Sequence, residues 1–248
     1  MSPIKTSAIV LKSINWKDSS KIVSLYTREH GRINVIAKGA RRSNSQYQGI
    51  LESVNLIEVT VYISPNRQLQ ILGQASVEES YPKIRLDFEK TAYTFAILEL
   101  VDIFFQQTSA DIIFFDFMQN LLMEMQIIEN PQIVFWYFLL KLSSYLGFRP
   151  DFETCYKCST KITSEEVLFL IHKGSVICNN CSSGTPKTWR LTYSARTSLR
   201  DLQKANHKSL SSLSIELAPK FPYLDFLLNY LRYHSEEKLE LSALKLLN

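Results

Sequence analysis

The four cysteines of this chain fall in two Cys-x-x-Cys pairs, and that spacing suits a metal site. The pairs are Cys155/Cys158 and Cys178/Cys181, with nineteen residues between them. Two tight turns can each present two thiolates to one ion, as in zinc sites of the ribbon type. Four thiolates fill a tetrahedral shell and leave no position for a substrate, so the pattern predicts one structural zinc ion. The alternative is two pairs of reduced thiols that bind no metal.

The segment between the two pairs must bring them together. Glu166 to His172 is apolar and strand-like, Lys173-Gly174 can turn, and Ser175 to Ile177 can return. We therefore expect one β-hairpin that carries both cysteine turns. A zinc-dependent nuclease or hydrolase would need an open metal position, and a shell of four cysteines leaves none.

A second set of residues that could do chemistry lies between Arg32 and Tyr47. Lys38, Arg41 and Arg42 surround Gly39-Ala40 after an expected strand, so the turn should project cations, and guanidinium groups suit phosphate oxygens. Cations beside aromatic rings are what sequence-tolerant binding of single strands requires. The candidate nucleic-acid-binding residues are Trp16, Lys17, Lys21, Arg32, Lys38, Arg41, Arg42 and Tyr47. The alternative is a solvated basic loop, with the aromatic side chains in a core.

The elements that must position these residues begin with β-structure in the first eighty residues. Residues 56–63 alternate, with Ile57, Val59, Val61 and Ile63 on one face. Five short runs rich in β-branched residues suit a small closed barrel of the oligonucleotide-binding (OB) type better than a lone sheet. The expected strands cover residues 7–14, 21–27, 32–38, 56–63 and 68–76. Trp16, Lys17 and Lys21 would then lie around the loop between the first two strands.

From about Tyr81 the hydrophobic period changes from two to 3.6 residues, which indicates helices. Asn130-Pro131 should begin a central buried helix that Gly147 ends, and Ser194 should cap a later one. The expected helices cover residues 87–107, 111–128, 134–146, 194–204, 223–233 and 237–247. The fold class is therefore a multidomain α+β protein. We expect an OB domain over residues 1–80, a helical domain over 81–153 and 187–248, and a zinc-ribbon insertion over 154–186.

The net charge of +4 is unevenly distributed. The excess of Lys and Arg over Asp and Glu is +4 in residues 1–80, −4 in residues 81–152 and +4 in residues 153–248. Clustered positive charge favours a polyanionic partner. Near the C-terminus, Arg196, Arg200 and Lys204 recur every four residues and share one helix face. That face could contact nucleic acid or an acidic peptide, or could be merely solvated.

Signatures of catalysis and of membranes are missing from the sequence. None of the seven glycines lies in a G-x-x-x-x-G-K-[ST] or G-x-G-x-x-G motif, and no histidine belongs to an H-E-x-x-H pair. We predict that the protein is not an enzyme. The longest candidate membrane segment, residues 92–105, is interrupted by Glu99 and Asp102, and residues 1–5 lack the layout of a signal peptide. Paired thiols of the zinc type favour the reducing cytoplasm.

Several segments resemble the RecO family of bacterial recombination and repair mediators. They include Ser24-Leu-Tyr-Thr-Arg-Glu-His-Gly-Arg, Ile36-Ala-Lys-Gly-Ala-Arg-Arg and Tyr145-Leu-Gly-Phe-Arg-Pro, followed by the two cysteine pairs. The resemblance runs through most of the chain in the same order. It implies an N-terminal OB barrel, a helical domain and a zinc-ribbon insertion. Lys38, Arg41 and Arg42 fall on the basic barrel motif of the family.

The resemblance also implies a function. Members of the family bind single- and double-stranded DNA and anneal complementary strands. They work with RecR and with the single-stranded-DNA-binding protein to load RecA recombinase, which implies a bacterial cytoplasmic protein associated with the nucleoid. The alternative is a protein–protein adaptor in which the helical domain binds an acidic-hydrophobic peptide. Its groove would consist of residues 223–231, rimmed by Arg200 and Lys204.

Overall fold

The computed structural model describes residues 2–106, 110–184, 189–206, 210–211, 217–218 and 220–247. The chain forms two compact units. The first unit comprises Met1–Pro131 with Leu241–Asn248, and the second comprises Gln132–Glu240. The division expected from the sequence has its boundaries after residues 80, 153 and 186, which differ from those of the two units, and it stays a prediction.

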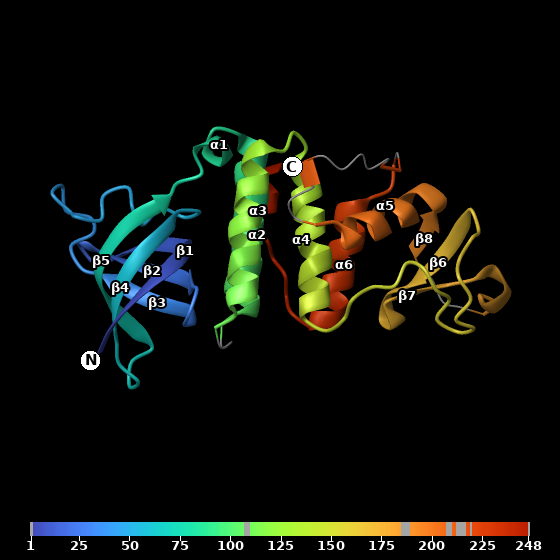
Figure 1. Cartoon of the computed structure of the whole chain (residues 1–248), viewed down its shortest axis with the longest axis horizontal. Helices are drawn as coiled ribbons and strands as arrows, with labels where there is room; N and C mark the ends of the chain where they lie inside the picture. The colour runs from blue at the N-terminus through green and yellow to red at the C-terminus, as the bar shows by residue number, and fades with distance from the viewer. Residues whose placement is uncertain are drawn as a thin grey trace. The chain divides into compact units, whose positions relative to one another are not determined.

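Five strands of the first unit close into a β-barrel in the order β1-β2-β3-β5-β4 (Figure 1). The strands are β1 (Ser2–Trp16), β2 (Ser20–Thr27), β3 (Gly31–Ala37), β4 (Leu56–Ile63) and β5 (Leu69–Glu79). Neighbouring strands are antiparallel except β3 and β5, and β1 closes the barrel by pairing with both β2 and β4. This is the five-stranded OB-type barrel that the sequence predicted.

Alternation along the strands explains the core of the barrel. Successive side chains of a strand point to opposite faces, so residues two apart share the inside. Ile57, Val59 and Val61 are buried in the core as predicted, and Ile63 is partly buried against it. The long segment between β3 and β4 contributes Leu51, which is also buried among these strands.

Three helices complete the described first unit together with a short C-terminal 3-10 helix. They are α1 (Pro82–Arg85), α2 (Phe88–Phe104), α3 (Ile112–Ile127) and η4 (Ala243–Leu247). Asp87 and Asp111 cap α2 and α3 by accepting backbone N–H groups. Tyr26 on β2 is fully buried, and its ring lies 5.3 Å from that of Phe105 and 5.8 Å from that of Phe114. Aromatic contacts thus join the helices to the barrel.

The helices of the second unit are α4 (Pro131–Tyr145), α5 (Tyr193–Lys204) and α6 (Tyr223–Ser235). Helix α4 is buried around most of its circumference, as predicted for a central helix. Its Trp136 ring stacks on Tyr223 at the start of α6, with ring centroids 4.6 Å apart. No helix in the described part of the chain is both long and apolar enough to cross a membrane.

The cysteine-bearing segment of the second unit contains a small antiparallel sheet of order β7-β6-β8. The strands are β6 (Glu166–Leu170), β7 (Ser175–Ile177) and β8 (Trp189–Thr192), with the 3-10 helices η1 (Ile171–Lys173) and η2 (Asn179–Cys181). The predicted hairpin is present, and its turn is η1 followed by Gly174 in the left-handed region. The sequence did not predict β8. This strand follows the hairpin in sequence and pairs antiparallel with β6.

Two predictions about helices are wrong. Residues 237–247 do not form one helix. The chain leaves α6 through Glu236 in a left-handed conformation, and only the 3-10 helix η4 follows. Leu239 and Leu241 are both buried, which is the spacing of an extended segment rather than of a helix face. Helix α5 is capped by Thr192 instead of Ser194, since the Thr192 hydroxyl accepts the N–H of Ala195 at 3.2 Å.

Candidate metal centre and nucleic-acid interface

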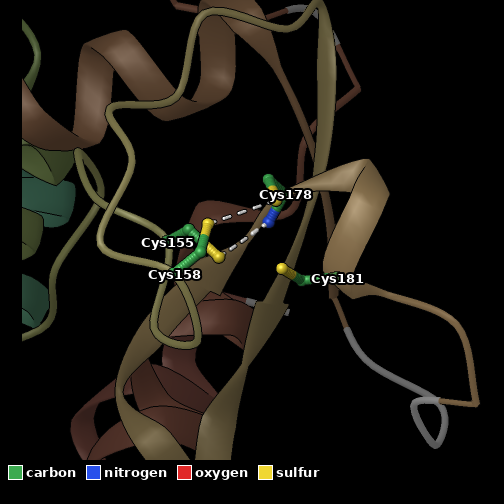
Figure 2. Close-up of side chains that lie close together, drawn as sticks. All are labelled: Cys155, Cys158, Cys178 and Cys181. Carbon is green, nitrogen blue, oxygen red and sulfur yellow. Dashed lines mark hydrogen bonds between the residues drawn. The ribbon is translucent and has the colours of Figure 1, made fainter.

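The four cysteines lie together although they come from two separate turns (Figure 2). Their sulfur atoms all lie within 4.8 Å of one another, and those of Cys158 and Cys178 are 3.8 Å apart. A tetrahedral ion with Zn–S bonds of about 2.3 Å places its sulfurs about 3.8 Å apart. The cluster is therefore close to the geometry that a four-thiolate site needs, and it can bind a metal ion.

Backbone hydrogen bonds shape the two turns. In the first turn, the N–H of Cys155 donates to the carbonyl of Thr160 at 2.9 Å, and Ser159 adopts a left-handed conformation. In the second turn, the N–H of Cys181 donates to the carbonyl of Cys178 at 3.0 Å. The N–H of Tyr156 donates to the carbonyl of Val176 on β7 at 2.8 Å, which fixes the first turn against the hairpin. The hairpin thus holds the turns as the sequence predicted.

The thiols differ in how readily they ionise. Burial raises the pKa of Cys155, but backbone N–H groups, foremost that of Cys178, outweigh burial and lower this pKa to about 6. The pKa of Cys181 is raised, chiefly by its side-chain contact with Cys178. Thiolates this close together repel one another, so the cluster resists carrying four negative charges by itself. A bound divalent cation removes that repulsion, so the donor set fits a metal.

The cations predicted at the end of the barrel are brought together by two turns. Arg41 donates its backbone N–H to the carbonyl of Ser19 at 2.9 Å, and its Nη1 to the carbonyl of Lys17 at 2.9 Å. The turn that follows β3 is thereby fastened to the turn between β1 and β2. Lys17, Lys38, Arg41 and Arg42 are all exposed, and we call these four residues the basic rim.

Gly39 gives the second turn its shape. It has φ +73°, and the N–H of Arg42 donates back to its carbonyl at 3.1 Å. The Arg42 side chain lies over Gly39 and forms no hydrogen bond or ion pair with the side chains that the structure describes. Arg42 and Lys38 therefore keep their donors available for an anion, whereas Arg41 uses one donor to hold the turn.

Trp16 ends β1 directly before Lys17, and 43% of its surface is exposed. An exposed indole beside several cations can stack on a base while the cations contact phosphates. The structure thus brings Trp16 next to the basic rim, in the arrangement that the sequence suggested.

Two of the predicted cations have partners of their own. Arg32 on β3 is only 13% exposed at its side chain, and its Nε forms an ion pair of 2.6 Å with Asp102 on α2. Asp102 also accepts a hydrogen bond from Ser24 at 2.6 Å, so Arg32 joins the barrel to α2. Lys21 lies 3.1 Å from Glu52 and is mostly covered. Neither cation is presented to solvent as those of the basic rim are.

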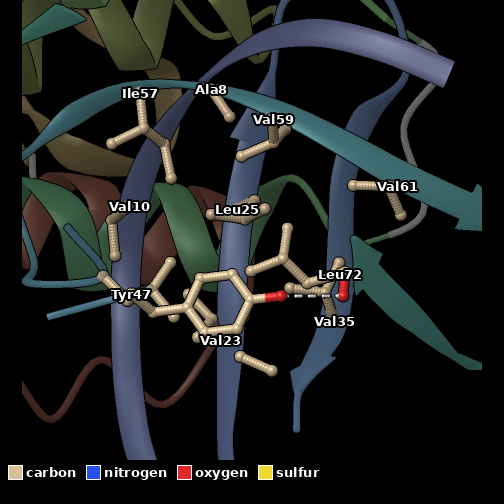
Figure 3. Close-up of a cluster of buried hydrophobic side chains, with 12 residues drawn as sticks. Ala8, Val10, Val23, Leu25, Val35, Tyr47, Ile57, Val59, Val61 and Leu72 are labelled. Carbon is tan, nitrogen blue, oxygen red and sulfur yellow. Dashed lines mark hydrogen bonds between the residues drawn. The ribbon is translucent and has the colours of Figure 1, made fainter. Parts of the chain in front are cut away.

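Tyr47 lies inside the barrel (Figure 3). It is 6% exposed, and its hydroxyl donates to the carbonyl oxygens of Leu72 at 3.2 Å and Gly73 at 2.7 Å. The ring packs among side chains that include Val10 and Val23. A base cannot stack on a ring in this position, so Tyr47 acts as a core residue of the barrel. The sequence left this outcome open, since small barrels also bury aromatic residues.

The C-terminal stripe of cations is buried at one of its three positions and paired at the other two. Arg196 is buried, and Lys204 lies 2.6 Å from Glu153 in an ion pair. The apolar residues expected to form a peptide groove are also mostly buried and belong to the core of the second unit, namely Tyr223, Phe226, Leu227, Leu228, Tyr230 and Leu231. The described residues of this segment therefore present no apolar groove that would favour the adaptor alternative.

The barrel with its basic rim, the helices and the four-cysteine cluster define an OB-barrel protein with a module that could hold a metal ion. Two family models match nearly the whole chain: Recombination protein O N terminal over residues 1–81 and Recombination protein O C terminal over residues 85–243. The chain therefore belongs to the RecO family, and its role is in DNA recombination and repair.

Several similar proteins from diverse bacteria carry the name DNA repair protein RecO. The DNA repair protein RecO of Desulforamulus reducens is 25% identical over 95% of this chain and 91% of its own length. That of Chlorobium phaeobacteroides strain BS1 is 28% identical over 93% of this chain and 92% of its own length. That of Bacillus pumilus is 32% identical over 79% of this chain and 75% of its own length. The likeness thus extends over both units.

Proposed function

We propose that this chain is a recombination mediator that binds single- and double-stranded DNA through the basic rim and Trp16 and anneals complementary strands. The observation that carries the proposal is the double contact of Arg41 with Ser19 and Lys17. That contact gathers the four cations of the rim at one end of the barrel, beside an exposed indole.

The mechanism we propose for annealing is neutralisation of charge. Two strands repel each other through their phosphates, and lysine and arginine side chains screen that repulsion while displacing counterions. Contacts to phosphates carry no sequence information and leave base edges free to pair. Trp16 would hold a single strand by stacking without selecting a base. This division of roles suits a protein that must accept any sequence.

We further propose that the cysteine cluster binds one zinc ion with a structural role. Cys155, Cys158, Cys178 and Cys181 would supply all four ligands, and the spacing of Cys158 and Cys178 supports a tetrahedral ion. A shell of four thiolates has no open position, which agrees with a protein that is not an enzyme. Zinc content per chain, measured by atomic emission on protein purified without chelator, tests this; less than half an equivalent of zinc would count against it.

The finer assignments rest on membership of the family. We propose that the protein works with RecR and the single-stranded-DNA-binding protein to load RecA recombinase onto coated strands, in the bacterial cytoplasm at the nucleoid. We also propose that the OB domain ends near residue 80, followed by helical parts over 81–153 and 187–248 around a ribbon over 154–186. The border between the two family models, at residues 81 and 85, supports the first of these boundaries.

The experiment that tests the proposal measures binding of a fluorescent oligonucleotide against salt concentration. Each phosphate contact contributes about 0.7 to the logarithmic salt slope on single strands and about 0.9 on duplex. Replacement of Lys38 and Arg42 by alanine should lower the slope on single strands by about 1.4 and slow annealing in the same samples. A slope unchanged by this double variant would show that the rim does not contact phosphates.

A further inference from the structure

A pocket of about 330 Å³ lies in the second unit, close to the cysteine cluster in sequence. One wall comes from the segment around the first cysteine pair and includes Glu153 and Lys161, and the other comes from α5 and includes Tyr193, Arg196 and Arg200. Three of these five side chains carry positive charge. The pocket belongs neither to the basic rim nor to the cluster of thiols.

Arg196 is the unusual member of the pocket. It is only 3% exposed, and its Nη1 donates to the carbonyl of Phe152 at 3.2 Å. Its Nε is buried without a hydrogen-bond partner, and the guanidinium forms no ion pair with any carboxylate that the structure describes. A buried charge left without a counter-charge is costly. Burial, followed by the nearby charge of Arg200, lowers the pKa of Arg196, and Tyr193 and Glu153 offset that shift only in part.

The carboxylates around Arg196 compensate its charge only in part, because none of those that the structure describes forms a direct ion pair with it. The carboxylate of the pocket, Glu153, is paired at 2.6 Å with Lys204 outside the lining. Arg200 pairs at 2.7 Å with Asp201 at the surface, where such a pair contributes little. Lys161 is exposed and adds a third cation. Tyr193, Arg196 and Arg200 recur along one face of the twelve-residue helix α5, so the pocket follows that face.

An aromatic surface adjoins these cations. The Arg196 guanidinium carbon lies 5.5 Å from the centroid of the Tyr193 ring, and half of the surface of Tyr193 is exposed. Apart from this ring, the lining offers only Ile162 as an apolar side chain. A hydrophobic peptide anchor would need more apolar surface than this. Cations next to an exposed ring instead fit the phosphate and the base of a nucleotide.

We propose that this pocket binds a phosphate group of a DNA strand and is a second nucleic-acid contact, separate from the barrel. Arg196 supplies the buried charge, Arg200 and Lys161 supply the outer donors, and Tyr193 provides the surface beside which the sugar or base lies. The inference rests on the proposed DNA-binding function. It adds a DNA contact in the second unit, whereas the basic rim lies in the first.

The test uses the full chain with Lys161 and Arg200 both replaced by alanine, since these side chains are partly or fully exposed and their removal should leave the fold intact. The matched control replaces Arg190 and Lys238, two exposed cations of the same unit outside the pocket. Binding of a fluorescent single-stranded oligonucleotide is measured by anisotropy. K161A/R200A should weaken binding by about tenfold and lower the salt slope by about 1.4. R190A/K238A should leave both quantities unchanged.

A second measurement locates the contact. An oligonucleotide that contains 4-thiothymidine should photocrosslink to the peptide that holds Tyr193 in the wild type, and this crosslink should disappear in K161A/R200A. Inorganic phosphate and an acidic peptide serve as competitors. Displacement of the crosslink by phosphate supports recognition of a phosphate group. An acidic peptide that binds in place of the oligonucleotide would overturn the proposal, as would wild-type binding and crosslinking by K161A/R200A.

The outcomes separate this inference from the proposed function. If K38A/R42A weakens binding while K161A/R200A does not, the rim stands and the pocket is refuted. If K161A/R200A weakens binding while K38A/R42A does not, the pocket stands and the role of the rim is refuted. Arg196→Lys adds a further check, because it keeps the positive charge but removes the planar guanidinium with its paired N–H donors. This variant should bind the oligonucleotide more weakly than the wild type does, even where its thermal stability is unchanged.

Discussion

The guanidinium of Arg41 donates to the backbone carbonyl of Lys17 at 2.9 Å, so one predicted DNA-binding residue also holds another in place. Arg42, its neighbour in sequence, has no such bond to a described side chain and lies over Gly39. Adjacent arginines of the same motif therefore do different work. The first organises the basic rim, and the second is available to a ligand.

This difference predicts unequal effects of two substitutions. Arg42→Ala should lower the salt slope of single-strand binding by about 0.7 and leave thermal stability unchanged. Arg41→Ala should weaken binding and also destabilise the first unit by about 1 kcal/mol, because the two turns lose a hydrogen bond. Anisotropy and chemical denaturation measure the two effects, with Lys83→Ala as a control for loss of an exposed cation. Equal effects of both arginines on stability would contradict this assignment.

Arg32 should behave as a structural residue. Its ion pair with Asp102 is largely covered, and Asp102 also accepts from Ser24. Arg32→Ala should destabilise the first unit by about 2 kcal/mol, because the partly covered carboxylate of Asp102 loses its cationic partner and keeps only the bond from Ser24. Denaturant unfolding measures this loss. DNA affinity, measured well below the unfolding midpoint, should remain near that of the wild type; a variant with normal stability and poor binding would show that Arg32 contacts DNA directly.

Gly174 should tolerate no side chain. It has φ +62°, and an added Cβ would lie 2.5 Å from the hydroxyl oxygen of Tyr230, which donates to the carbonyl of Phe148 at 2.7 Å. Gly174→Ala should therefore cost about 2–3 kcal/mol, from backbone strain together with the clash. Gly147→Ala is the matched control, since Gly147 has φ +92° and no atom near its added Cβ. Equal losses of stability in the two variants would exclude the clash.

Removal of metal should loosen the second unit and spare the barrel. Protons compete with metal for thiolates, so affinity for the ion falls as pH falls. Chelation or acidification to about pH 5 should increase hydrogen exchange in β6, β7 and the cysteine turns. Hydrogen exchange in β1 to β5 and DNA binding by the basic rim should not change. Faster hydrogen exchange in the barrel strands would contradict this prediction.

Glu99 should make the stability of the first unit depend on pH. Burial raises its pKa above the ordinary value of 4.5, although backbone N–H groups of Ala243 and Ser242 oppose the shift. The folded state then holds this proton more tightly than the unfolded state does, so stability is lost as pH rises above 4.5 and levels off above the folded pKa. Glu99→Gln should flatten that part of the stability curve. Chemical denaturation at a series of pH values measures the free energy of unfolding. A pH dependence that is the same in Glu99→Gln and the wild type would show that another group causes it.

The sequence determined the local features of this protein. Alternating β-branched residues defined the barrel strands, and the change to a helical period placed helices from residues 87 and 111, where the structure has the caps Asp87 and Asp111. The cysteine spacing predicted the candidate ligands, and the structure gathers all four sulfurs. The helix predicted over residues 237–247 is absent, and Leu239 and Leu241 are buried at the spacing of an extended segment.

Only the tertiary structure decided which side chains of the basic segments remain available. Arg32 and Lys38 look alike in sequence, yet one is paired across seventy residues with Asp102 and the other is exposed. Tyr47 and Trp16 differ in the same way, one inside the barrel and the other at its surface. The pocket at Arg196 likewise joins residues from separate segments. Burial and pairing depend on partners far away along the chain, and a pattern of near neighbours contains no record of those partners.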